Sequence, residues 1–398
     1  MLLGVQIINF DVFDNDRCGS LLDDPVDSLR LRGLNALIGR NDTGKSCFLN
    51  VMSFLKRTVT GNAAKASVSD GRPGFYNLLL DNGSPCEFKL FFKLKGRRYI
   101  QYELQIEATR YGSPRIRREA AYISVKKEDG FARECLMELN CGRGYAVRDG
   151  NREETEITDE HLTALNILGR IGCYPDLVLL YREIERWFFC SFSIDDAGSY
   201  FTDGNAPGGH KHLNGDGSNV INVLQYLKDI SPDSYDGMLE EIRGKIPSMK
   251  KKKKNLPQQL QESPNKLFLY LLLFRDPDPL STVFIETPDN DLYHDMVDVL
   301  SDEMREFTIR NPFSQIIFTT HNPYIIETVN PKEIWIFSRD FDSDDDRVDI
   351  RCAGADPLVN ELFRQGVGMG AIWYGGHLDT DDGPAGDVTA EKKDDGNP

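Results

Sequence analysis

Apolar and polar positions follow two different periods along this chain. From Cys86 to Val125, apolar and polar residues alternate, which is typical of antiparallel strands with one face in solvent. From Thr282 onward, short apolar runs alternate with helical segments, which predicts β-α-β units and a largely parallel sheet. We therefore expect an α/β fold with an antiparallel β layer and a helical insertion in its middle.

Shorter patterns predict the individual elements. Apolar runs bounded by polar residues predict strands at 1–10, 34–38, 282–286, 315–319 and 333–338. Apolar residues spaced by three and four predict helices at 45–56, 157–190, 220–227, 234–243, 266–274, 291–309 and 323–329. Polar, Gly-rich or acidic stretches predict loops at 60–84, 198–218 and 340–347.

The composition narrows the class of protein. The chain has 398 residues, 40% of them hydrophobic and 28% charged, as in globular proteins. Its formal net charge of −16 disfavours a surface that coats nucleic acid, because phosphate binding needs clustered Lys and Arg. No apolar run reaches the length of a membrane span, and the first ten residues lack the features of a secretion signal. The eight cysteines form no C-x-x-C pair, and we expect a cytoplasmic protein.

One segment carries a phosphate-binding pattern. Gly39-Arg40-Asn41-Asp42-Thr43-Gly44-Lys45-Ser46 fits G-x-x-x-x-G-K-[ST], between a predicted strand and a predicted helix. Glycines let the backbone approach phosphate oxygens, and the N–H groups at the helix start supply positive potential. We expect Lys45 to reach the β- and γ-phosphates of ATP and the Ser46 hydroxyl to bind Mg²⁺. The expected nucleotide contacts are Gly39, Arg40, Asn41, Asp42, Thr43, Gly44, Lys45, Ser46 and Cys47.

Two later strands end in residues that suit the same site. The apolar run at 283–285 ends at Glu286, whose carboxylate would lie near the metal if its strand runs beside the phosphate-loop strand. The run at 316–320 ends at His321, which would reach the γ-phosphate. We therefore predict Glu286 and His321 as catalytic residues, with Ser46 and Glu286 as metal ligands.

These motifs, in this order, resemble a known family. The phosphate loop, a helix led by Ser263, the segment Phe284-Ile285-Glu286 and the pair Thr320-His321 are similar to ABC ATPases of the RecF, SMC and overcoming-lysogenisation type. The match is nearest to the compact bacterial and archaeal "AAA family" predicted ATPases without a coiled coil, and it extends to about Gly376. The resemblance implies an ABC-type P-loop ATPase head.

The resemblance also implies roles for residues far from the phosphate loop. Ser263 and Asn265 stand where the family has a signature that contacts the γ-phosphate held by a second protomer, so a homodimer with sandwiched nucleotide is expected. The segment 289–291 would be the D-loop, and His321 the H-loop switch residue.

Three departures from the family pattern bear on catalysis. Thr287 stands where the family carries a catalytic glutamate, and Asn265 replaces the signature glycine. The segment 246–263 is also short. Since loss of a general base typically costs about 10²–10⁴-fold in rate, we expect at most a slow ATPase, with Thr287 a degenerate catalytic residue.

The resemblance implies an organisation of the chain. Residues 1–376 would form the ATPase head. Independently of the resemblance, the Asp-, Gly- and Pro-rich composition after His377 predicts a disordered acidic tail at 377–398. Within the head we expect a P-loop part at 1–60, the antiparallel layer at 85–125, a helical insertion at 155–250, and the signature, Walker B and H-loop part at 263–376.

These motifs favour two functions over a third, a scaffold with a vestigial phosphate loop, which the intact Lys45 and Ser46 disfavour. The first is a head that dimerises on binding ATP and hydrolyses it weakly, in DNA repair or anti-phage defence by family analogy. The second is a pseudo-ATPase that senses nucleotide and regulates a separately encoded effector such as a nuclease. Candidate partners are a second copy, DNA and such an effector, and no membrane.

Three further clusters each have a less specific interpretation. The run Lys250–Lys254 is either a DNA contact or a solvated loop. The acidic stretch 342–346 is expected to be a hairpin tip rather than a nuclease site. His210 and His212, two residues apart, are weak candidates for metal ligands.

Overall fold

The structure is a computed structural model. It describes residues 1–25, 28–96, 98–127, 130–193, 209–246, 266–339 and 347–378. Ser263, Asn265, the lysine run, the acidic stretch 342–346 and the tail beyond 378 lie outside these residues, so the predictions made for them stay predictions.

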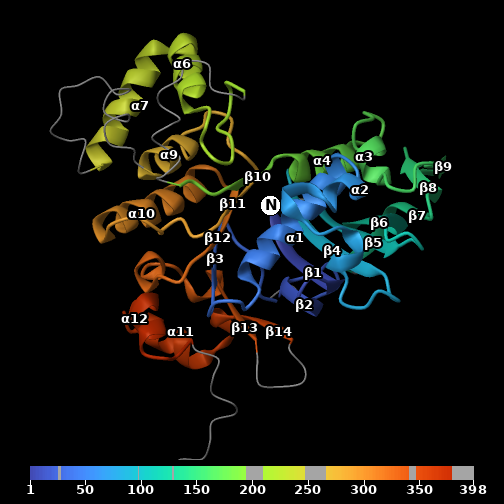
Figure 1. The fold of residues 1–398 in the computed structure, drawn as a ribbon, viewed down its shortest axis with the longest axis horizontal. Coiled ribbons are helices and arrows are strands. Elements are labelled where there is room, and N and C mark those ends of the chain that lie inside the picture. The colour runs from blue at the N-terminus through green and yellow to red at the C-terminus, as the bar shows by residue number, and fades with distance from the viewer. Residues whose placement is uncertain are drawn as a thin grey trace, which may run out of the picture.

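Two sheets organise the molecule (Figure 1). The first has eight antiparallel strands, in the spatial order β2 (Phe13–Gly19), β1 (Leu2–Phe10), β4 (Cys86–Leu94), β5 (Arg98–Ala108), β6 (Pro114–Lys127), β7 (Gly130–Asn140), β8 (Arg143–Arg148) and β9 (Asn151–Glu156). The second is mostly parallel, in the order β10 (Trp187–Cys190), β11 (Thr282–Ile285), β12 (Gln315–Thr319), β3 (Leu34–Ile38), β13 (Ile334–Arg339) and β14 (Val348–Cys352). The predicted α/β class with an antiparallel layer is confirmed.

Helices cover the two sheets. Beside the antiparallel sheet lie α1 (Lys45–Thr60), α2 (Ala63–Ala66), α3 (Ala164–Leu168) and α4 (Pro175–Glu185). On the other side of the parallel sheet lie α6 (Val220–Ile230), α7 (Pro232–Lys245), α9 (Lys266–Leu273), α10 (His294–Arg310), α11 (Pro357–Arg364) and α12 (Met369–Tyr374).

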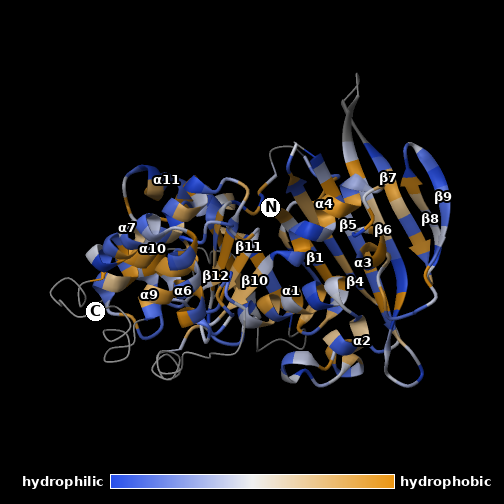
Figure 2. Ribbon diagram, turned by 90° about the horizontal axis from the view of Figure 1, so that it is seen from above, coloured by the Kyte–Doolittle hydropathy of each residue, from blue (hydrophilic) through white to orange (hydrophobic). Residues whose placement is uncertain are grey.

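The parallel strands separate two hydrophobic cores. Phe284 packs in the core shared by α1, α4 and the antiparallel sheet, whereas Val283 and Ile285 pack with α9 and α10. Because both faces are covered, β11 is buried at every position, and the three residues after Thr282 are hydrophobic, as is typical of buried parallel strands. Figure 2 shows this concentration of hydrophobic residues along β10 to β12, in contrast to the mixed strands of the antiparallel sheet.

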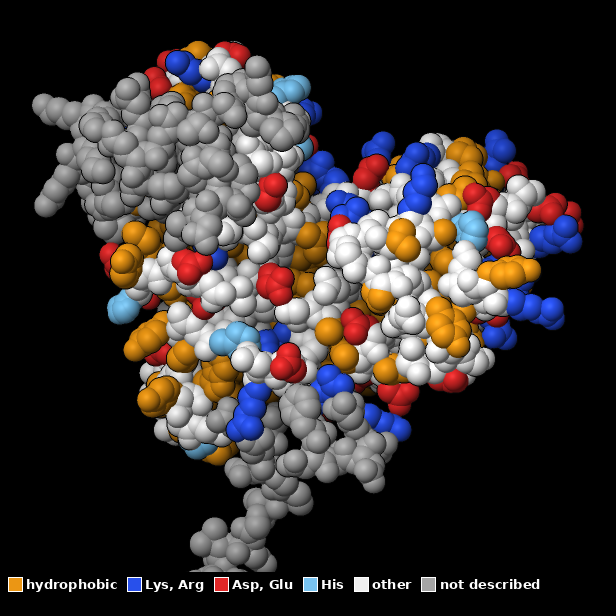
Figure 3. Space-filling model, viewed as in Figure 1, with side chains coloured by type: hydrophobic (Ala, Val, Ile, Leu, Met, Phe, Trp, Pro, Cys, Tyr) orange, Lys and Arg blue, Asp and Glu red, His pale blue; other side chains and the backbone are white. Residues whose placement is uncertain are grey.

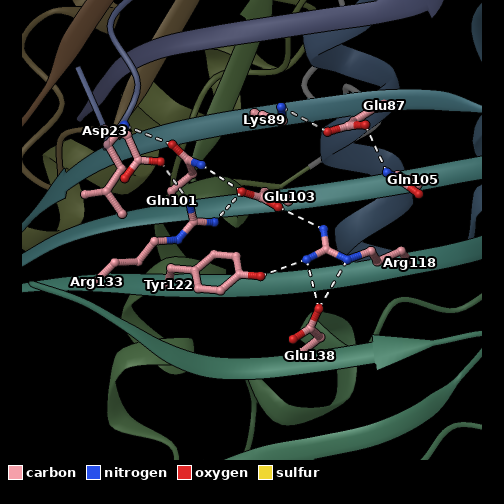
Figure 4. A network of polar contacts seen from close by, with 11 residues as sticks. Asp23, Glu87, Lys89, Gln101, Glu103, Gln105, Arg118, Tyr122, Arg133 and Glu138 are labelled. Atoms are coloured by element: carbon pink, nitrogen blue, oxygen red, sulfur yellow. Dashed lines mark hydrogen bonds and ion pairs between the residues drawn. The ribbon is translucent and has the colours of Figure 1, made fainter.

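The antiparallel sheet buries one face and keeps the other polar. On its buried face, the Phe10 ring lies 4.8 Å from that of Phe54 on α1 and 5.1 Å from that of Phe88. On the polar face, Glu103 accepts hydrogen bonds from Arg118 at 2.8 Å and Arg133 at 2.7 Å (Figure 4). The two arginine side chains cover Glu103, which is buried although it lies on the polar face of the sheet.

One buried carboxylate ties the antiparallel sheet to a helix. Glu119 on β6 accepts hydrogen bonds from the backbone N–H groups of Ala164 and Leu165, at the start of α3, and from the Tyr102 hydroxyl at 2.9 Å. It is 2% exposed. Burial raises the pKa of Glu119 to about 7, against the lowering effect of these three donors.

The structure corrects the predicted type or bounds of several helices and strands. Residues 187–190, expected within a helical segment, form strand β10, because a four-residue apolar run beside β11 completes the sheet and periodicity cannot separate such a run from a helix. The antiparallel sheet continues beyond Val125 through β7, β8 and β9. The stretch 323–329 is helical only as a short 3₁₀ turn at Pro323–Ile326. Strand β14 and helices α11 and α12 were not predicted.

Candidate nucleotide site

The phosphate loop joins the end of β3 to the start of α1. Gly39 has φ +145° and Gly44 has φ +97°, a region that favours glycine. A Cβ on Gly39 would lie 2.1 Å from the carbonyl oxygen of Phe337 on the neighbouring strand β13. Backbone geometry therefore favours glycine at both positions of the motif.

Lys45 lies folded into this loop. Its ammonium donates to the carbonyl oxygens of Gly39, at 2.9 Å, and Arg40, and lies 3.2 Å from the hydroxyl oxygen of Thr43. Burial lowers the pKa of Lys45 to about 8, with Asp42 opposing the shift. The loop thus holds a desolvated cation among backbone groups, an arrangement that fits the oxygens of a triphosphate.

Ser46 and Glu286 meet across the sheet. β11 and β3 lie on either side of β12, all parallel, so the end of β11 and the phosphate loop share one edge. The Ser46 hydroxyl donates to Glu286 Oε1 at 2.5 Å. Hydroxyl and carboxylate oxygens are the ligands Mg²⁺ prefers, so the pair fits the predicted metal position.

A cavity of about 370 Å³ opens over the phosphate loop. It is lined by Asn41, Asp42, Gly44, Lys45, Ser46, Cys47, His321 and Arg339. His321 follows β12, and burial, followed by the Lys45 charge, lowers its pKa. An N–H of the His321 ring can donate a hydrogen bond to a ligand oxygen in this cavity.

Thr287 has a strained backbone conformation, and both its N–H and its hydroxyl make hydrogen bonds. Its φ of +40° is rare for a β-branched residue. Its N–H donates to the Thr319 hydroxyl at 3.0 Å, and its hydroxyl accepts from the Asn290 amide at 3.1 Å. The ammonium of Lys266, 3% exposed, lies 2.9 Å from the Asn290 carbonyl and 3.4 Å from that of Thr287. Hydrogen bonds with Lys266, Asn290 and Thr319 therefore hold the turn at the end of β11 in place.

The structure brings together most of the predicted residues. The phosphate loop, Glu286 and His321 converge at the carboxyl edge of the parallel sheet, where ligands bind in open α/β sheets. Thr287 is adjacent but does not line the cavity over the phosphate loop. Ser263 and Asn265 fall outside the described residues.

Arg339 was missed by the sequence analysis. It ends β13, pairs with Asp42 through a hydrogen bond to that carbonyl at 3.4 Å, and lines the cavity. Its charge also lowers the pKa of the half-buried Asp11, although burial raises that pKa overall. The available signal was its position after a strand predicted to lie in the parallel sheet.

The histidines of the Gly-rich loop have structural partners. His212 Nδ1 lies 2.5 Å from Asp276 Oδ2, and the His210 ring lies 4.7 Å from that of Tyr226. Among the described residues, no cluster of three His, Cys, Asp or Glu could hold a metal ion. The weak metal hypothesis for this histidine pair finds no support in the described part of the chain.

The surface is uneven in charge. In Figure 3, several Lys and Arg side chains lie along the part that carries α3 and α4, with Asp and Glu side chains among them. Local positive charge thus exists on a chain of net charge −16. No helix in the described ranges is both long and apolar enough to cross a membrane.

One family model matches part of the chain. Residues 265–327 match a family model described as "AAA domain, putative AbiEii toxin, Type IV TA system". This stretch contains α9, Glu286, α10 and His321. The match confirms the resemblance to AAA-type ATPases and supports a nucleotide-binding ATPase. A search of the curated proteins finds no match.

Several solved structures resemble the fold at low identity. A crystal structure of an Smc head bound to the C-winged helix domain of ScpA has 13% identity and a TM-score of 0.43, over 88% of this chain and 97% of that one. The SMC head domain from Thermotoga maritima has 12% identity and a TM-score of 0.39, over 88% and 98%. A third structure is an Smc head with an extended coiled coil, bound to the C-terminal domain of ScpA derived from Pyrococcus furiosus. It has 13% identity and a TM-score of 0.39, over 91% of this chain and 99% of that one.

Proposed function

We propose that this protein is an ATP-binding head that uses Mg²⁺ and hydrolyses ATP slowly. The observation that carries the proposal is the hydrogen bond between Ser46 and Glu286, 240 residues apart in sequence, beside a phosphate loop with a buried lysine. Lys45 and the loop N–H groups would hold the phosphates, and Ser46 with Glu286 would hold the metal, which neutralises charge on the phosphates.

We further propose that ATP brings two heads together. Next to the site, Tyr293 is 79% exposed and Tyr324, three residues after His321, is 63% exposed. The ring of His294 stacks on that of Tyr324 at 5.5 Å. Exposed aromatic side chains of this kind are typical of protein contacts, so this surface suits a second copy that would present its Ser263 segment to the nucleotide.

Sedimentation velocity tests head association. Wild-type protein with Mg²⁺-ATP is expected to shift from monomer to dimer, and Lys45→Ala is expected to stay monomeric under the same conditions. A wild-type protein that binds ATP yet sediments identically with and without it would refute the dimer.

The setting proposed is anti-phage defence, with DNA repair as the other family setting. The matched family model is named for a putative toxin of a toxin–antitoxin system, which favours defence. A separately encoded effector, DNA and a location in the cytoplasm belong to this proposal. Co-purification of a neighbouring gene product with wild-type protein but not with Lys45→Ala would support an effector, and its absence would count against one.

A pseudo-ATPase is the second candidate, and Thr287 favours it. The hydroxyl at this position is a poor base and already accepts a hydrogen bond from Asn290. In that case wild-type protein binds ATP without releasing phosphate, and Thr287→Glu gains turnover. Steady phosphate release by wild type that Lys45→Ala abolishes would exclude this candidate.

A further inference from the structure

A second cavity lies next to Glu286. Its volume is about 300 Å³, and it is lined by Leu49, Phe189, Cys190, Ser191, Gly215, Asp216, Phe284 and Glu286. Glu286 and Asp216 are the two carboxylates in this lining. Glu286 also accepts the hydrogen bond from Ser46, which lines the cavity over the phosphate loop, so this pair joins the linings of the two cavities.

The loop that carries Asp216 is held rigidly against the parallel sheet. The N–H of Ser191, directly after β10, donates to the Gly215 carbonyl at 3.0 Å. A Cβ on Gly215 would lie 2.4 Å from the Phe189 carbonyl oxygen, so the loop backbone touches the strand. The Asn219 side chain accepts from the Asn214 N–H at 2.7 Å and donates to two loop carbonyls. A side chain on this loop is therefore preorganised.

The orientation of the Asp216 carboxylate is also fixed. Its Oδ1 accepts from the Ser218 N–H at 3.0 Å and from the Ser218 hydroxyl at 2.7 Å. Both hydrogen bonds are made by Oδ1, so Oδ2 takes part in neither of them. The side chain is exposed to solvent, and water can therefore reach that oxygen.

We propose that Asp216 is the carboxylate that orients and deprotonates the attacking water, in place of the acid missing at Thr287. This inference rests on the proposed ATP hydrolysis. The water oxygen forms a bond to the γ-phosphorus while the bond from that phosphorus to the β,γ-bridging oxygen breaks. The water proton passes to Asp216, and ADP and phosphate leave. Glu286 remains the metal ligand, so two neighbouring carboxylates take different roles.

Asp216→Asn tests this role, because asparagine keeps an oxygen that accepts from Ser218 but cannot take a proton. The matched control is Asp229→Asn, an exposed aspartate on α6 that also accepts a local hydrogen bond, from Gln225 at 2.7 Å. We expect phosphate release by Asp216→Asn to fall about 10²-fold or more. Its ATP affinity and its urea unfolding midpoint are expected to match wild type. The ATP-bound dimer should persist longer in sedimentation, a readout independent of turnover.

Each other outcome overturns the inference. Unchanged phosphate release in Asp216→Asn would show that this carboxylate activates no water. If Asp216→Asn lost ATP affinity together with phosphate release, Asp216 would be a binding residue. If it lost folding stability instead, Asp216 would serve to hold the loop in place. A wild type that binds ATP without releasing phosphate would also reject the role of Asp216 while leaving nucleotide binding intact. A wild type that binds no ATP would instead refute the proposed function itself.

Discussion

Replacing Glu119 with glutamine is expected to change how the stability of the protein depends on pH. This carboxyl is buried, and its pKa of about 7 lies above its ordinary value of 4.5. The folded protein therefore holds the Glu119 proton more tightly than the unfolded chain does. Its contribution to stability is fully present below pH 4.5 and is lost as the pH rises through 7.

The magnitude follows from the difference between the two pKa values. At about 1.4 kcal/mol per pKa unit, a rise from 4.5 to about 7 corresponds to about 3 kcal/mol lost between pH 4.5 and pH 8. Glu119→Gln does not titrate and avoids this loss. It does place an amide where two backbone N–H groups and Tyr102 donate, at a constant cost of about 1–3 kcal/mol.

The assay is urea unfolding of wild type and Glu119→Gln at several pH values from 5 to 8. The free energy of unfolding of the variant, relative to wild type, should improve by about 2–3 kcal/mol across this range. Glu240→Gln, an exposed substitution on α7, serves as the control and should show a constant difference. A constant difference for Glu119→Gln as well would refute the reasoning that this carboxylate is held buried against α3.

Three further predictions concern the site and the polar sheet face. Because burial lowers the pKa of Lys45 to about 8, ATP affinity measured by titration should fall about tenfold per pH unit above 8, and a flat profile to pH 9.5 would contradict a desolvated lysine. Arg339→Met should weaken ATP binding about tenfold, whereas Arg364→Met, on exposed α11, should leave it unchanged; equal affinities would remove Arg339 from the site. Glu103→Gln should lower the free energy of unfolding by about 1–3 kcal/mol, while the exposed Glu156→Gln should change it by less than about 0.5 kcal/mol, and similar values for both would contradict a stabilising network.

The sequence was most informative at positions where the chemistry allows few residue types. The glycines of the phosphate loop, the lysine and serine that follow, and apolar strands ending in Glu286 and His321 predicted a site that the parallel sheet assembles at one edge. In these cases local pattern and global topology point to the same answer.

The sequence was uninformative where tertiary contacts decide. Residues 187–190 are apolar enough for a helix or a strand, and only their pairing with β11 selects the strand. Strands β7 to β9 are rich in charged residues that pair across the sheet, so hydrophobic alternation alone ended too early. The position of Arg339 after a predicted strand gave a partial signal, but only the fold shows that it lines the cavity over the phosphate loop. The sequence gives no signal that Asp216 lines a cavity together with Glu286.

The most direct test of nucleotide binding is a calorimetric titration with ATP, with and without Mg²⁺, of wild type, Lys45→Ala and Glu286→Gln. We expect wild type to bind ATP, Lys45→Ala to lose binding, and Glu286→Gln to lose mainly the gain in affinity that Mg²⁺ provides. Equal heats for wild type and Lys45→Ala, or a Mg²⁺ effect unchanged in Glu286→Gln, would contradict the site described at the edge of the parallel sheet.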